Sequence, residues 1–176
     1  MKVAYINPFI LATRNVFDTM IRVPVSVGRP YLRAAKDQPN RCYRISAVIR
    51  LSGSATGQVV LNLSESAALA LGSGLAGITL RKIDNVCLDA LAEFVNRVTG
   101  GAKKQFPGGQ VSVSLPTLLP TAQVVFPRDC PAVVIPFDTS VGRFTLDISL
   151  WGFDVASPRR PAQANQPLSP PTQAAA

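Results

Sequence analysis

Residues 89–104 read DALAEFVNRVTGGAKK, and they lie in a longer segment whose apolar residues recur at helical spacing. An α-helix turns by about 100° per residue, so apolar residues three and four positions apart share one face. This segment therefore predicts a helix over about residues 82 to 104. Its buried face would carry Ile83, Cys87, Ala90, Leu91, Phe94 and Val98.

The opposite face of this expected helix carries a row of four residues, Asp89, Glu93, Asn96 and Gly100. Separations of four, three and four residues keep their side chains in one outward stripe. Helix stability does not favour this choice, because acids four apart repel and an interior glycine costs about 1 kcal/mol relative to alanine. A plain structural role stays open on geometry alone, since acids suit the positive end of a helix and glycines can end one.

Composition limits the chemistry that such a row could perform. The chain has 176 residues, of which 47% are hydrophobic, and this suits one domain with a sizeable core. It has no histidine, which excludes Ser-His-Asp and Cys-His nucleophile systems and histidine-ligated metals. Its apolar runs are shorter than the roughly 18 to 20 residues that span a bilayer, so no membrane span is expected. Three widely spaced cysteines fit neither a disulfide framework nor a metal pair, and they favour a reducing cytoplasm.

The segments around the row predict the rest of the fold. Asn7-Pro8 is expected to start a first helix, with Asn7 as its N-cap, that runs to Pro24. A β-hairpin is expected at about residues 43 to 63, and Ser64 would cap a short helix after it. Between them, residues 25–42 indicate a strand fragment and an irregular connection. Strands are expected last at AQVVFP (122–127), AVVIPFDTS (132–140) and GRFTLDISLWGF (142–153).

The predicted class is therefore α+β, with two long helices packed on one face of a mainly antiparallel sheet. Residues 1–153 would form the folded domain. Residues 154–176 are rich in proline, alanine and glutamine, have little to bury, and are expected to form a disordered tail.

Asp89, Glu93 and Asn96 match the D/S-x-x-x-E-x-x-N signature of the CheC/CheX/FliY family of chemotaxis phosphatases. AEFVNRVTGGAKK itself resembles the extended helix motif of CheX proteins. The similarity extends, in family order, over about residues 3 to 152. It includes INPFILATRNVFDTM, ISAVIRLSGSATGQVVLNLSESAALAL and AVVIPFDTSVGRFTLDISL.

The resemblance implies an enzyme that hydrolyses the phosphoaspartate of a CheY-like response regulator. By correspondence, Asn96 would orient the attacking water and Glu93 would engage the regulator's active-site lysine. Asp89 would make a supporting contact with the partner. The chain would need no metal or cofactor of its own, because the Mg²⁺ ion belongs to the regulator. Gly100, we infer separately, would let a partner loop approach closely.

The resemblance also implies a CheX-like homodimer with one active face per chain. CheC-type members carry two active helices, whereas the first helix here has no glutamate three residues before Asn15.

Two other classes of function are weighed against this one. A CheX-like adaptor or flagellar-switch module would bind a phosphorylated response regulator without hydrolysing it. A nucleic-acid-binding domain would suit the net charge of +8, but the arginines are scattered and no aromatic-basic stripe is present. No nucleic-acid partner is therefore expected.

Overall fold

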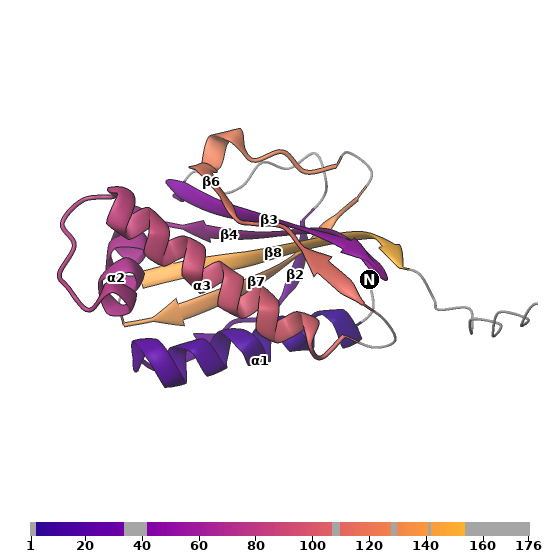
Figure 1. Ribbon diagram of the computed structural model, residues 1–176, viewed down its shortest axis with the longest axis horizontal. Helices are drawn as coiled ribbons and strands as arrows, with labels where there is room; N and C mark the ends of the chain where they lie inside the picture. Colours follow the sequence, from indigo (N-terminus) through magenta and orange to yellow (C-terminus); the bar gives the residue numbers. More distant parts are fainter. Residues whose placement is uncertain (1–2, 34–41, 107–109, 128–129, 141, 154–176) are drawn as a thin grey trace, which may run out of the picture.

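The computed structural model describes residues 3–33, 42–106, 110–127, 130–140 and 142–153. Within them, eight strands form one sheet whose central order is β1-β7-β8-β4-β3-β5. Three α-helices lie together on one side of this sheet (Figure 1). Every strand pairing is antiparallel, with β2 beside β7 and β6 beside β3.

The helices are α1 (Asn7–Val16), α2 (Glu65–Ala76) and α3 (Asn85–Lys103), and a π-helical turn, η2 (Phe17–Ile21), extends α1. Two short 3-10 turns are η1 (Val3–Tyr5) and η3 (Thr121–Gln123). The strands are β1 (Val25–Val27), β2 (Tyr31–Arg33), β3 (Ile45–Gly53), β4 (Ala55–Leu63), β5 (Val111–Val113), β6 (Thr117–Pro120), β7 (Ala132–Thr139) and β8 (Gly142–Phe153). None of the helices in the described residues is both long and apolar enough to cross a membrane.

The core lies between the helices and the sheet. Successive side chains of a strand point to opposite faces, so alternate residues of β3, β4 and β8 meet the helices. Phe144 of β8 stacks on Phe17 with ring centroids 5.6 Å apart. Phe94 of α3 meets both rings edge to face, at 5.9 Å from Phe17 and 6.1 Å from Phe144. This aromatic cluster joins η2, α3 and the sheet.

Most of the predicted elements are confirmed. The α+β class, the antiparallel sheet, the hairpin made by β3 and β4, and the short helix capped by Ser64 are all present. The last two predicted strands correspond to β7 and β8. Residues 154–176 lie outside the described residues, so the predicted division into domain and tail stays a prediction.

Four details of the sequence-based prediction outside α3 are wrong. The N-cap of α1 is Ile6 rather than Asn7. Regular α-helix gives way to the π-turn at Phe17, and Arg22, with a left-handed φ of 58°, ends it before Pro24. Ala122 and Gln123 of AQVVFP belong to η3 and residues 124–127 form no strand, whereas VSVSLPTLL (111–119) supplies the strands beside β3. Residues 25–33 hold two strands, β1 and β2, rather than one strand fragment. Residues 34–41 of the predicted connection lie outside the described residues.

A buried polar cluster occupies the sheet face away from the helices. Asp147 of β8 is fully buried, and its Oδ2 accepts from Asn62 Nδ2 at 2.8 Å. The same oxygen forms an ion pair with Arg33 Nη2 at 2.6 Å. The Arg33 guanidinium also lies 4.4 Å from the ring centroid of Phe126. Burial raises the pKa of Asp147, and Arg33 opposes that rise.

Removing the cation from this cluster tests its contribution to stability. Arg33→Met should cost about 3–5 kcal/mol at neutral pH, because it leaves a buried carboxylate without its cation. Losing Arg33 raises the folded-state pKa of Asp147 further, so the folded state then binds a proton that the unfolded state has released. The loss should therefore shrink as pH falls towards the unfolded pKa of about 3.9.

Urea unfolding at pH 8 and pH 5 measures this difference. Arg50→Met, at an exposed arginine of β3, is the matched control and should change stability little at either pH. An equal loss for Arg33→Met at both pH values would contradict the account.

Candidate functional site

The candidate site lies on α3, whose start is fixed by its own sequence. Asp84 precedes the helix in an extended conformation, and its Oδ1 accepts a hydrogen bond from the backbone N–H of Cys87 at 3.2 Å. This side-chain cap satisfies one backbone donor of the first turn, so the helix begins at Asn85 rather than near residue 82. Its buried face holds Cys87, Leu91, Phe94, Val95, Val98, Thr99 and Ala102.

The structure brings the four predicted residues together on the solvent side of α3. Asp89 and Glu93 are exposed, while Asn96 and Gly100 are partly exposed. In the described part of the chain, no ion pair or hydrogen bond engages the side chain of Asp89 or the carboxamide of Asn96. The donors and the acceptor of that amide therefore face solvent.

Glu93 has a partner that the sequence analysis missed. Its Oε1 lies 2.5 Å from Nε of Arg97, one turn further along the helix. The four-residue spacing from acid to base is the signal that could have revealed this pair. Both side chains are about half exposed, at 49% and 51%. Such a pair contributes about 0–1 kcal/mol, so a competing cation can displace Arg97 at little cost.

The two glycines after the row have different surroundings. A Cβ at Gly100 would meet no heavy atom within 4 Å. A Cβ at Gly101 would lie 3.1 Å from the Cβ of Ala12 on α1. Gly101 therefore serves the close approach of two helices, whereas Gly100 leaves an open surface beside Asn96.

The first helix does not build a second row of this kind. Asn15 is exposed on α1, but the position three residues before it is Ala12, which is buried against α3. A carboxylate at Ala12 would point into the helix interface rather than to solvent.

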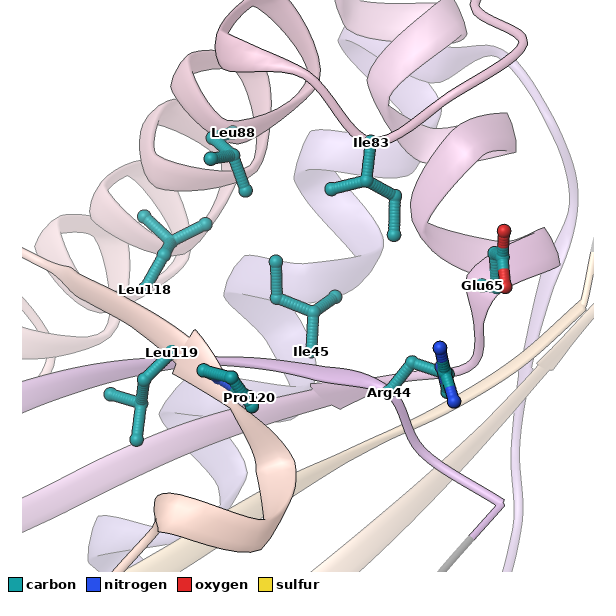
Figure 2. Close-up of a pocket in the computed structure, with 8 residues that line it drawn as sticks. All are labelled: Arg44, Ile45, Glu65, Ile83, Leu88, Leu118, Leu119 and Pro120. Atoms are coloured by element: carbon teal, nitrogen blue, oxygen red, sulfur yellow. The ribbon is translucent and has the colours of Figure 1, made fainter.

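An open apolar pocket of about 460 Å³ borders the N-terminal end of the row. Leu88 of α3, Ile83, Ile45 and Leu118 surround it, and Arg44 and Glu65 lie at one end (Figure 2). Leu88 immediately precedes Asp89, and its side chain points about 100° away from the row, so the pocket lies beside the row. The described residues contain no group of three or more histidine, cysteine, aspartate or glutamate side chains placed to hold a metal ion.

Comparison with protein families gives one match. The family model described as chemotaxis phosphatase CheX matches residues 45–138. This range runs from the start of β3 into β7 and includes all of α3. No curated protein sequence matches the chain.

Solved structures share the fold over most of this chain. A CheC-like superfamily protein from Shewanella sp. PV-4 is 25% identical, with a TM-score of 0.74 over 86% of this chain and 100% of that one. The chemotaxis protein CheX of Desulfovibrio desulfuricans is also 25% identical, with a TM-score of 0.72 over 84% and 99%. CheX of Borrelia burgdorferi, in a complex with CheY, BeF₃ and Mg²⁺, is 20% identical, with a TM-score of 0.71 over 83% and 97%.

The contrast between the two glycines generates a stability prediction. Gly100→Ala should raise the free energy of unfolding by up to about 1 kcal/mol, because alanine is the better helix former and meets open space. Gly101→Ala should gain less or lose stability, because its Cβ crowds Ala12. Urea unfolding of the two variants measures the difference, and a larger gain for Gly101→Ala would contradict this geometry.

Proposed function

The chain belongs to the CheX family of chemotaxis phosphatases, and we propose that it hydrolyses the phosphoaspartate of a CheY-like response regulator. One observation carries the proposal. Glu93 and Asn96 project together from the solvent side of a helix whose other side is locked in the core, and the Asn96 amide is unengaged in the described structure.

The reaction needs positioning more than covalent chemistry from the enzyme. Water attacks phosphorus in line with the aspartyl oxygen, the P–O bond to the aspartate breaks, and inorganic phosphate and a free carboxylate result. The Asn96 carbonyl oxygen can accept a hydrogen bond from this water, and its NH₂ group can donate to a phosphoryl oxygen. Holding the water in line accounts for the rate gain.

Glu93 provides the contact that orients the regulator. Its carboxylate is proposed to exchange Arg97 for the regulator's active-site lysine, which a surface ion pair of small net energy permits. Asp89, one turn earlier, extends the acidic side of the row as a supporting contact. Gly100, one turn after Asn96, leaves room for the regulator's backbone to approach.

The metal ion of this reaction is assigned to the regulator, and no cofactor of the chain's own is proposed. The complex of Borrelia CheX with CheY, BeF₃ and Mg²⁺ supports a partner of this kind. The reaction is placed in the cytoplasm, which fits the free thiols of Cys87 and Cys130. A homodimer is expected from the family, and sedimentation as a monomer at micromolar concentration would count against it.

Two substitutions separate catalysis from docking. Asn96→Ala should lower turnover by about 10² or more, the scale of losing a positioning or charge-stabilising contact, while binding survives. Glu93→Ala should mainly lower the affinity for the regulator, because it removes a charge-assisted contact. The measurement is phosphoaspartate decay in a panel of regulators over a range of enzyme concentrations.

Matched controls come from the same helix. Asn85→Ala makes the same chemical change at an exposed position about 16 Å away along the axis, and it should leave turnover unchanged. Arg97→Ala removes the ion pair but keeps Glu93, so it should not reproduce the affinity loss of Glu93→Ala. If folded Asn96→Ala dephosphorylates as fast as the wild type, the amide is not catalytic and the adaptor function takes its place.

A further inference from the structure

Two lysines continue the row beyond Gly100. At about 100° per residue, Lys103 and Lys104 lie on either side of the line through Asp89, Glu93 and Asn96, each about 50° from it, and Lys104 is the C-cap of α3. Both lysines are exposed. The stripe therefore begins with two carboxylates, has the Asn96 amide at its centre, and ends with two ammonium groups.

Neither lysine is neutralised by the described part of the chain. The ion pairs found there join Arg33 to Asp147, Arg97 to Glu93 and Arg143 to Asp138, and none includes Lys103 or Lys104. A favourable interaction with the negative end of the helix accounts for a cation in the last turn. It does not account for the hollow beside the two lysines.

This hollow has a volume of about 430 Å³ and lies between the end of α3 and the start of β5. Lys103, Lys104, Gln110 and Ser112 line it together with Phe106. The Phe106 ring packs edge to face against Tyr5 at 5.2 Å and Phe9 at 5.6 Å between centroids, so the floor is held by the core. Two ammonium groups, an amide and a hydroxyl thus surround a space on a rigid base, and all four can donate hydrogen bonds to carboxylates.

We propose that Lys103 and Lys104 form a second docking contact of the phosphatase face, which receives an acidic segment of the phosphorylated response regulator. This inference rests on the proposed function. It adds to that function an acidic segment on the regulator's surface, at the end of the contact opposite its lysine. Lys103 follows Asn96 by seven residues, so the acidic segment should lie about 10 Å from the phosphoaspartate along the direction of α3.

Opposite charges at the two ends of the row fix how the partner lies on it. The regulator's lysine reaches Glu93 only when its acidic segment lies over Lys103 and Lys104. The reversed orientation would place acid against acid and base against base, and like charges across an interface are costly. The lysines therefore act on affinity, orientation and association rate, and they do not touch the reacting atoms.

The test compares a double variant of the two lysines with a control double variant that removes the same charge elsewhere. In Lys103→Gln/Lys104→Gln, KM for a phosphorylated regulator should rise about three- to tenfold while kcat stays unchanged, because rim charges govern encounter rather than chemistry. Its KM should also depend less on salt than that of the wild type. Arg81→Gln/Lys82→Gln removes an equal charge from an adjacent exposed pair before α3, and it should leave KM near the wild-type value. Lys103→Arg/Lys104→Arg keeps both charges and should restore KM.

Parallel measurements separate failure of this inference from failure of the proposed function. If the wild type is active, Asn96→Ala is not, and the lysine variant keeps the wild-type KM and salt dependence, the second contact is overturned while the phosphatase function stands. If no regulator is dephosphorylated, binding of regulators charged with BeF₃ and Mg²⁺ is compared instead. Weaker binding by the lysine variant then supports the contact on an adaptor, and equal or absent binding overturns it.

Discussion

The buried position of Phe94 is the constraint on which the candidate site depends. Its ring packs edge to face against both Phe17 of η2 and Phe144 of β8, and this arrangement fixes the rotation of α3 about its axis. Glu93 immediately precedes Phe94, and Asn96 follows it by two residues. Once the ring is in the core, helical geometry places both side chains on the solvent side. The site therefore needs no loop or bound ion to hold its direction.

This coupling explains why the solvent-facing position of Glu93 and Asn96 was predictable from the sequence. The apolar period predicted correctly that Cys87, Leu91, Phe94 and Val98 are buried, whereas Ile83 precedes α3 and Ala90 is only partly buried. The opposite face then followed from about 100° per residue. The hairpin was equally clear, because β3 and β4 are β-rich runs on either side of a short turn. The roles of Glu93 and Asn96 were inferred from the family resemblance, because helical geometry alone does not indicate the chemical role of a side chain.

Interactions between distant segments were not predictable in the same way. The pair formed by Arg33 and Asp147 joins residues 114 positions apart, and no local pattern indicates it. The segment AQVVFP has strand-like composition, but β5 and β6 already pair with β3, and strand pairing is decided by the whole sheet. Asn7 is a residue type that favours the N-cap position, yet Ile6, one residue earlier, is the N-cap of α1. Of these, only the assignment of AQVVFP is explained by strand pairing elsewhere in the sheet.

The central claim is that one face of α3 is the surface that meets a phosphorylated regulator. Amide chemical shifts of the ¹⁵N-labelled chain, followed during titration with a regulator charged with BeF₃ and Mg²⁺, test it most directly. The account predicts that the largest shifts fall at Glu93, Asn96 and Gly100, including the side-chain amide of Asn96. Shifts confined to the opposite face of the sheet, with α3 unchanged, would contradict it.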